Sequence, residues 1–263
     1  MSSVSMAPIT IHAAPIRRSA TASSMRARRD EDAARRSARC SACNLRDICL
    51  PGGLDEKGMD EFSDMVYTRK RVERGDTLYR TGEDFNAIYA VHAGFFKSSV
   101  VLEDGRDQVT GFHMMGEIVG MDGIGTEHHT TDVIALEDSE VCIIPYARLE
   151  EAGLQRQLHK AMSRELVRDQ GVMMLLGTMR AEERLAAFLL NLSQRFVARG
   201  FSSSEFHLRM TREEIGSYLG LSLETVSRLF SRFQDDGLMG VQQKHITIHD
   251  IPGLKSVMGR TND

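Results

Sequence analysis

The sequence contains few cysteines and no long hydrophobic stretch. Only four of its 263 residues are Cys, too few for the disulfide framework of a small secreted domain. No run approaches the roughly 18 apolar residues of a membrane-spanning helix, and the N-terminus has no apolar signal-peptide core. These absences argue against an integral membrane protein and a disulfide-rich secreted protein, so we expect a cytoplasmic protein.

Basic residues are missing from one long stretch of the chain. Between Gln108 and Ala147 there is no Lys or Arg, whereas seven Asp and Glu residues fall there. This stretch would therefore repel a small anionic ligand. The chain also lacks a nucleophile-base grouping and a phosphate-binding glycine motif. We therefore expect no enzymatic activity.

The charge that is present is distributed unevenly. The formal net charge of -4 divides into +5 for residues 1–39, -10 for 40–179 and +1 for 180–263. The first 39 residues are rich in Ser, Ala and Arg without a periodic apolar pattern, which predicts a disordered extension. No acidic residue precedes Asp30, as in organellar transit peptides, but a solvated tail with nonspecific attraction to DNA is the simpler interpretation.

The middle of the chain has a strand pattern. Short apolar stretches separated by glycines run from Met65 to about Ile144, which predicts an antiparallel barrel or roll. Asp104-Gly105 predicts a two-residue hairpin turn, because both positions of such a turn need residues that tolerate positive φ.

After Pro145 the period becomes helical. No proline occurs from Leu154 to Met179, and a heptad pattern predicts a long helix with one apolar seam. Such a seam can pack on its own barrel or form a parallel dimer contact, and the charged Asp169 within it favours the dimer. The predicted interface residues are Leu158, Met162, Leu166, Asp169, Met173 and Leu176.

The cysteines form the strongest chemical signal. Cys40, Cys43 and Cys49 make a C-x2-C-x5-C run, and Cys142 is the remaining cysteine. Clustered cytosolic cysteines bind metal more often than they form disulfides, and three clustered thiols plus a remote one suit an iron-sulfur cluster. Zinc, a redox disulfide and unliganded thiols stay open. If strand residues alternate around Cys142, its side chain and that of Ile144 share one face, over which the cysteine segment can fold.

The C-terminal part contains a helix-turn-helix pattern. Thr211 and Glu214 form a capping box, Gly220 ends that helix, and Ser222 can cap the next one. An apolar stripe in the second helix leaves Glu224, Ser227 and Arg228 on its outer face near the N-terminus, where helix-turn-helix proteins read the major groove. An ordinary exposed helix would look similar. Residues 239–248 read as a β-hairpin, which predicts a winged domain.

Taken together, these features resemble the CRP-FNR transcription regulators, and among them the oxygen-responsive FNR branch. The match spans about Cys40 to Asp250 and includes Ala181–Phe188 and Leu223–Arg228. The resemblance implies an α+β fold with five parts: an extension (1–39), a cluster-binding segment (40–50), a β-roll sensor domain (51–150), a dimerisation helix (151–179) and a winged helix-turn-helix domain (180–263).

The resemblance also implies a mechanism. Cys40, Cys43, Cys49 and Cys142 would ligate an oxygen-labile [4Fe-4S] cluster that favours a homodimer, and its loss would give a monomer that releases DNA. Glu224, Ser227 and Arg228 would read a TTGAT-N4-ATCAA type palindrome in double-stranded DNA. An exposed hairpin would contact RNA polymerase; its residues are Leu102, Glu103, Asp104, Gly105, Arg106 and Asp107.

Three alternatives stay open within this fold. A cyclic-nucleotide sensor is disfavoured by the missing basic residues, and no cyclic nucleotide is expected. A haem sensor would need His113, His128 or His129 as an axial ligand, although His128-His129 reads as a polar loop. A zinc protein that binds DNA constitutively would keep the helix-turn-helix and lose the sensing. Ala42, Asn44 and Ile48 lie among the cysteines at positions that can tune cluster stability.

Overall fold

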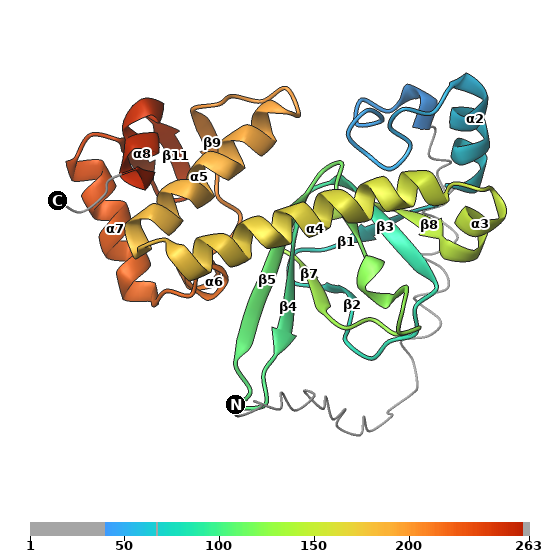
Figure 1. Cartoon of the computed structure of the whole chain (residues 1–263), viewed down its shortest axis with the longest axis horizontal. Helices are drawn as coiled ribbons and strands as arrows, with labels where there is room; N and C mark the ends of the chain where they lie inside the picture. Colours follow the sequence, from blue (N-terminus) through green and yellow to red (C-terminus); the bar gives the residue numbers. More distant parts are fainter. Residues whose placement is uncertain (1–39, 67, 260–263) are drawn as a thin grey trace, which may run out of the picture.

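The computed structural model describes residues 40–66 and 68–259, and the extension at 1–39 lies outside them. The chain forms two lobes joined by one long helix, α4 (Gln155–Thr178) (Figure 1). One lobe holds the strands of the roll together with the cysteine segment, and the other holds the C-terminal helices. The α+β architecture is therefore as predicted.

The roll consists of two antiparallel four-stranded sheets, with strand orders β1-β8-β3-β6 and β2-β7-β4-β5. Its strands are short and separated by turns in which glycines adopt positive φ, such as Gly94 and Gly116. The strands are β1 (Thr68–Val72), β2 (Thr77–Tyr79), β3 (Ala87–Ala93), β4 (Phe95–Val101), β5 (Asp107–Met114), β6 (Ile118–Val119), β7 (Asp132–Ala135) and β8 (Ser139–Pro145).

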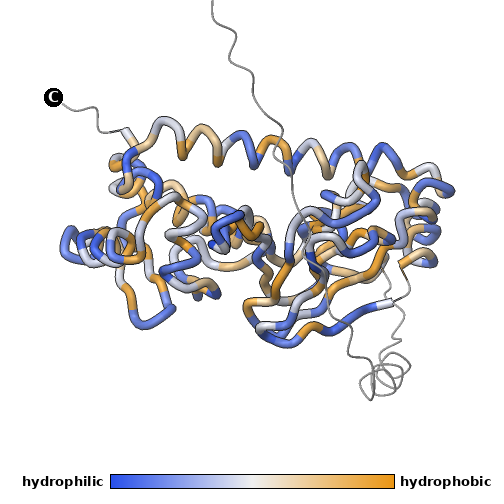
Figure 2. The backbone as a smooth tube through the Cα atoms, turned by 90° about the horizontal axis from the view of Figure 1, so that it is seen from below, coloured by the Kyte–Doolittle hydropathy of each residue, from blue (hydrophilic) through white to orange (hydrophobic). Residues whose placement is uncertain are grey.

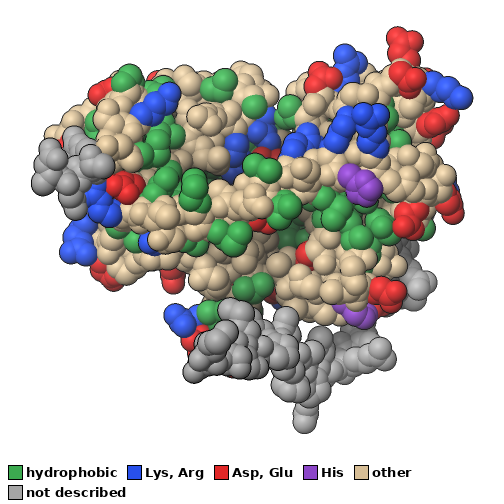
Figure 3. All heavy atoms as spheres, viewed as in Figure 1, with side chains coloured by type: hydrophobic (Ala, Val, Ile, Leu, Met, Phe, Trp, Pro, Cys, Tyr) green, Lys and Arg blue, Asp and Glu red, His purple; other side chains and the backbone are tan. Residues whose placement is uncertain are grey.

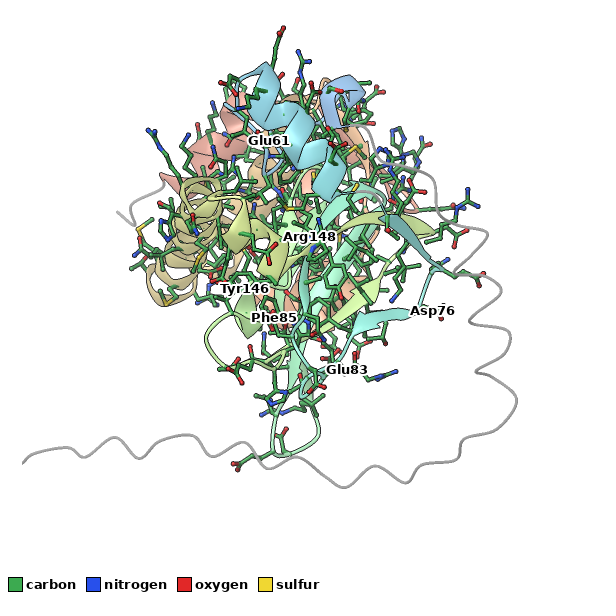
Figure 4. All side chains as sticks on the ribbon, turned by 90° about the vertical axis from the view of Figure 1, so that its right-hand side faces the viewer. Glu61, Asp76, Glu83, Phe85, Tyr146 and Arg148 are labelled. Atoms are coloured by element: carbon green, nitrogen blue, oxygen red, sulfur yellow. The ribbon has the colours of Figure 1, made fainter. Side chains whose placement is uncertain are left out.

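Short helices surround the roll. The 3-10 turns are η1 (Cys40–Ala42) and η2 (Met121–Gly123), and the helices are α2 (Glu56–Met65) and α3 (Tyr146–Glu151). Figure 4 views the end of the roll where α2 carries Glu61, and where Phe85 and Tyr146 lie beside each other with ring centroids 5.2 Å apart. Helix α2 is an addition to the predicted plan. Residues 146–151 form α3, so the long helix begins at Gln155 and not at 151.

The C-terminal lobe is a winged helix-turn-helix, as predicted. Helices α6 and α7 pack on each other and on α5, α8 packs on α5, and the sheet β10-β11-β9 forms the wing. Its elements are α5 (Ala181–Val197), β9 (Glu205–His207), α6 (Arg212–Leu219), α7 (Leu223–Asp235), β10 (Met239–Gln242), β11 (His245–Ile248) and α8 (Ile251–Met258).

Buried apolar side chains form three cores. The inner core fills the roll and includes Val91, Phe96 and Val141. The outer core lies between the roll, α2 and α4, and includes Phe62 and Cys142. The C-terminal core extends into the roll, since side chains from β4 and β5 belong to it. The two lobes therefore share one continuous apolar contact.

One turn differs from its prediction. Five residues, 102–106, connect β4 to β5, and the turn closes with the Gly105 N–H donating to the Leu102 carbonyl over 2.9 Å. Gly105 has φ +83°. The two-residue hairpin at Asp104-Gly105 was therefore wrong in length, although it located the turn, because its glycine supplies the left-handed conformation.

Candidate functional site

The cysteine segment is a chain of tight turns anchored by two buried leucines. Leu45 and Leu50 are 7% and 2% exposed. The Cys43 N–H donates to the Cys40 carbonyl over 3.1 Å, and the Cys49 N–H donates to the Leu45 carbonyl over 2.9 Å. At the start of the segment the Cys40 N–H donates to Ser63 Oγ on α2, 3.1 Å away. Helix α2 thus fixes where the segment begins.

The fourth cysteine lies on the roll and faces this segment. Cys142 sits in β8 between β1 and β3, opposite Arg69 and Ala90. Its side chain and that of Ile144 belong to the outer core, whereas Val141 points into the inner core. The predicted alternation is therefore confirmed. Cys40 and Cys49 pack against the same outer core, so the fold brings a residue about 100 positions away to the cysteine segment.

The four thiols are close enough to influence one another. Burial raises the pKa of Cys49 to about 12, and charge on Cys142, Cys40 and Cys43 adds to the rise. Burial also raises the pKa of Cys142 to about 11, with Cys40 and Cys43 contributing. All four are free cysteines. Within the described ranges, no three Cys, His, Asp or Glu side chains are arranged to hold a single metal ion.

Next to the cysteine segment, a buried carboxylate joins the lobes. Ile48 lies against Gly116, so closely that a Cβ at Gly116 would come within 2.7 Å of Ile48 Cδ1. The next residue, Glu117, is 8% exposed. Its carboxylate binds Arg195 Nη2 on α5 at 2.6 Å and Arg199 Nη2, in the turn that follows α5, at 2.7 Å.

Helix α4 contributes a third arginine to this carboxylate, because Arg168 Nη2 lies 3.5 Å from Glu117 Oε1. We call Glu117, Arg168, Arg195 and Arg199 the Glu117 junction. Burial alone would raise the pKa of Glu117, but Arg195 and Arg168 outweigh it and lower the pKa to about 2. The junction borders a cavity of about 360 Å³ reached by Asp47 and Ile48, in the hollow where basic side chains gather between the lobes (Figure 3).

Sequence reasoning missed this junction. Its partners are separated by about 50 to 80 residues, and no local spacing connects them. One signal was available, since the stretch from Gln108 to Ala147 carries acidic residues without any basic ones. A buried acid in such a stretch must take its basic partner from elsewhere in the chain.

The helix-turn-helix geometry follows its predicted caps. Thr211 Oγ1 accepts from the Glu214 N–H over 3.1 Å, and Glu214 Oε2 accepts from the Thr211 N–H over 2.7 Å. Gly220 ends α6 with φ +63°, and Ser222 caps α7. Val226, Phe230 and Phe233 are buried, so the opposite face of α7 is free to meet another molecule.

The three predicted base-reading residues lie on that free face. Glu224, Ser227 and Arg228 are exposed, and Arg228 Nη2 is 3.4 Å from Thr225 Oγ1. Hydrogen bonds from the N-terminal turn and the Ser222 side chain lower the pKa of Glu224, which keeps its carboxylate available as an acceptor.

Helix α6 is also docked on the roll. Lys97 Nζ lies 3.1 Å from Glu214 Oε1, the Val109 N–H donates to Ser217 Oγ over 2.8 Å, and Ser217 Oγ donates to the Asp107 carbonyl over 3.1 Å. The candidate polymerase hairpin, from Leu102 to Asp107, is exposed beside this contact.

Helix α4 exposes most of its predicted seam. Met162, Leu166 and Met173 are 40%, 58% and 64% exposed, which is high for large apolar side chains. Figure 2 shows hydrophobic and hydrophilic positions alternating along this helix at one side of the molecule. Asp169 is exposed and Leu176 is half-buried. Leu158 is only 4% exposed and belongs to the outer core, so it contacts its own chain.

The three candidate haem ligands have other neighbours. His113 is buried 2.9 Å from Ser98 Oγ, and burial lowers its pKa to about 4. His129 is 2% exposed and stacks on Tyr79 with centroids 3.7 Å apart. Only His128 is exposed, 3.2 Å from Asp84. His128 and His129 lie in a loop with acidic partners, as the polar-loop interpretation predicts, but the ring of His129 is buried because Asp122 and Tyr79 enclose it.

The two lobes match two different domain families. Residues 69–155 match the cyclic nucleotide-binding domain and residues 183–257 match the Crp-like helix-turn-helix domain. The chain is 47% identical over 228 residues to the transcriptional regulatory protein btr of Bordetella pertussis, covering 85% of this chain and 94% of btr. It is 42% identical over 229 residues to the fumarate and nitrate reduction regulatory protein of Escherichia coli, covering 85% and 92%.

A solved structure agrees with these matches. The structure of FixK2 from Bradyrhizobium japonicum has a TM-score of 0.68 and 29% identity, covering 74% of this chain and 98% of FixK2. No helix in the described part of the chain is long and apolar enough to span a membrane.

Proposed function

The chain belongs to the CRP-FNR family of transcription regulators, in its FNR-like part, and from this premise we propose that it is an oxygen-responsive regulator. Members of this family are regulators and not enzymes; they bind DNA through the helix-turn-helix and form homodimers. The proposed signal centre is a [4Fe-4S] cluster on Cys40, Cys43, Cys49 and Cys142. The observation that carries the proposal is the convergence of Cys142 with the cysteine segment on the outer core.

The donor set fits such a cluster. Four thiols are the ligands that iron-sulfur clusters take. Here Cys40, Cys49 and Cys142 pack against one apolar core, and Cys43 is close enough to add to the rise in the pKa of Cys49 and Cys142. When bound, the cluster would supply an oxygen-labile link between the cysteine segment and β8. The same thiols could hold zinc, and the constitutive zinc protein stays the rival.

The signal has a physical route from this segment to both other parts of the protein. Ile48 precedes Cys49 and lies against Gly116, which is followed by Glu117. Glu117 holds Arg168 of α4, Arg195 of α5 and Arg199 just beyond the end of α5. A shift of the cysteine segment would therefore act on the dimerisation helix and on the DNA-binding lobe through one buried carboxylate.

The exposed seam of α4 would form the dimer. Burial of the apolar side chains of Met162, Leu166 and Met173 would favour association. The carboxylate of Asp169 and its symmetry mate would oppose association. Partial desolvation raises the pKa of Asp169 above its ordinary value, and the nearby charge of Arg168 opposes the rise without cancelling it. We therefore propose a homodimer when the cluster is bound and a monomer when it is lost.

The DNA site follows from α7. In a two-fold dimer, two copies of Glu224, Ser227 and Arg228 would read half-sites of the TTGAT-N4-ATCAA type, about one helical turn apart. Arg suits guanine O6 and N7, and Glu suits the cytosine amino group. The hairpin from Leu102 to Asp107 would face RNA polymerase. No cyclic nucleotide is proposed, because the acidic roll residues would repel it.

The test is DNA binding by protein purified without oxygen. Fluorescence anisotropy with a labelled TTGAT-N4-ATCAA duplex and a scrambled duplex would be recorded before and after air is admitted. Specific binding that disappears in air together with iron and sulfide supports the proposal. Equal binding in both conditions by a zinc-containing protein would replace it with the constitutive DNA binder.

A further inference from the structure

Arg69 is the charged residue nearest in the sheet to the roll cysteine. In the antiparallel pair β1-β8, Arg69 is the register partner of Cys142. Partners in such a pair point to the same face, with Cβ atoms about 4.5–5.5 Å apart. On that face the side chain of Cys142 belongs to the outer core. Arg69 therefore flanks the thiol from β1, the edge strand of the sheet.

One nitrogen of Arg69 has no acceptor. Its Nη1 donates to Glu140 Oε2 over 3.2 Å, whereas its Nε is buried and has no hydrogen-bond partner among the described residues. Buried N–H groups are almost always paired in folded proteins.

We propose that Arg69 is a positioning residue of the cysteine centre, whose Nε–H donates to the sulfur of Cys142 when that sulfur is a cluster ligand. This inference rests on the proposed function. Hydrogen bonds to the sulfurs and local charge set the potential of an iron-sulfur centre, and a charge-assisted donor favours the state with more negative charge. Arg69 therefore raises the reduction potential and slows loss of the centre in air.

Neighbouring charges supply controls of both signs. Glu140 partly neutralises Arg69, and His92 Nδ1 lies 3.1 Å from the same carboxylate oxygen. Arg71 is two residues along β1, lies opposite Glu140 and has a side chain 76% exposed, with its Nε 4.0 Å from Glu140. Removing Arg71 changes the charge of the same strand without touching the register position of Cys142.

The experiment compares reconstituted proteins under anaerobic conditions. The full chain and the variants Arg69→Met, Arg69→Lys, Glu140→Gln and Arg71→Met would be loaded with iron and sulfide. The reduction potential is measured by spectroelectrochemistry, and the loss of visible absorbance is timed after air is admitted. Thermal unfolding of each variant checks the fold.

The inference predicts opposite effects on the two sides of the ion pair. Arg69→Met should lower the potential and speed bleaching roughly tenfold, Arg69→Lys should fall between it and the parent, and Arg71→Met should match the parent. Glu140→Gln should raise the potential, because it leaves the Arg69 charge unopposed. A general structural role would make Arg69→Met and Glu140→Gln shift in the same direction.

Failure of the Arg69 role and failure of the proposed function would give different results. If the parent protein binds four irons and Arg69→Met has the parent's potential and bleaching rate, the role of Arg69 is wrong and the proposed function stands. If Arg69→Met does not fold, Arg69→Lys and Glu140→Gln still decide the sign. If the parent protein takes up no iron and sulfide, the proposed function itself fails.

Discussion

The helix-turn-helix and the cysteine segment differ in how complete they are. Helices α6 and α7 have their caps, a buried stripe and an exposed reading face supplied by neighbouring residues of the chain. Cys40 and Cys49 of the cysteine segment pack with Cys142 of β8 against the outer core, where burial raises the pKa of all three thiols. The helix-turn-helix is thus built by the chain alone, whereas the role proposed for the cysteine end requires a bound metal centre.

This difference would let one chain keep a stable DNA reader beside the proposed conditional sensor. Metal binding to a site of this kind contributes folding free energy locally, so loss of the centre can loosen the cysteine segment while α7 stays intact. The Glu117 junction connects the two ends. Substitutions among the cysteines should therefore change the iron content, and substitutions on the exposed face of α7 should change DNA binding while the iron content stays the same.

The largest effect should come from Cys142→Ala. This change removes the one proposed ligand on the roll, so we expect loss of the visible absorbance and of iron and sulfide after anaerobic reconstitution. Circular dichroism should still report a folded C-terminal lobe. Arg228→Ala is the matched opposite, since it should keep the iron. Full iron content in Cys142→Ala would remove Cys142 from the ligand set.

Breaking the connection should cost less. Glu117→Gln leaves three arginines around a neutral side chain, and removing one partner of a buried ion pair costs about 3–5 kcal/mol. Urea unfolding measures this loss. The exposed pair of Asp104 and Arg106 offers the control, because Asp104→Asn breaks an ion pair in water and should leave stability almost unchanged. Equal effects in both variants would mean that the junction does not join the lobes.

Acid should titrate the same junction. The pKa of Glu117 is about 2 in the folded protein, against an ordinary value of 4.5. The folded state binds fewer protons there, so this contribution to stability is complete above pH 4.5 and is lost as the pH falls toward 2. Urea unfolding at several pH values should show a steeper loss in the parent than in Glu117→Gln. Identical slopes would contradict the assignment to Glu117.

A smaller and more specific change is expected at the reading face. Arg228→Ala should relax discrimination at one base pair in each half-site by about 1–3 kcal/mol. Anisotropy titrations against duplexes with single substitutions measure it. A uniform loss on every duplex, including a scrambled one, would instead identify Arg228 as a phosphate contact.

The smallest expected effect lies at the seam. Asp169→Ala removes two facing carboxylates, so the dimer should persist in air with a dissociation constant at least about tenfold lower, or about 1.4 kcal/mol. Analytical ultracentrifugation at several concentrations measures this change. Ser163→Ala changes a residue of the same helix that does not belong to the apolar seam, so it should leave the dissociation constant unchanged. If Asp169→Ala is a monomer in air, the proposal that facing Asp169 carboxylates oppose dimerisation through α4 is wrong.

Local signals explain what could be predicted from the sequence. Thr211 and Glu214 cap α6 because they are three residues apart, and Cys142 faces outward because strand residues alternate. Glu117 and Arg195 meet across 78 residues, a contact that depends on the docking of whole domains. His129 is buried by stacking on Tyr79, which no local pattern indicates. Leu158 follows the heptad but packs inward, since the roll covers the first turns of α4.

The central claim is that one metal centre on the four cysteines controls dimerisation. Protein purified without oxygen should be sedimented in a centrifuge that records visible absorbance, and iron and sulfide should be assayed in the same sample before and after exposure to air. The account predicts a brown dimer with four irons per chain that bleaches and becomes a monomer. A colourless protein that contains zinc and sediments identically in both conditions would contradict it.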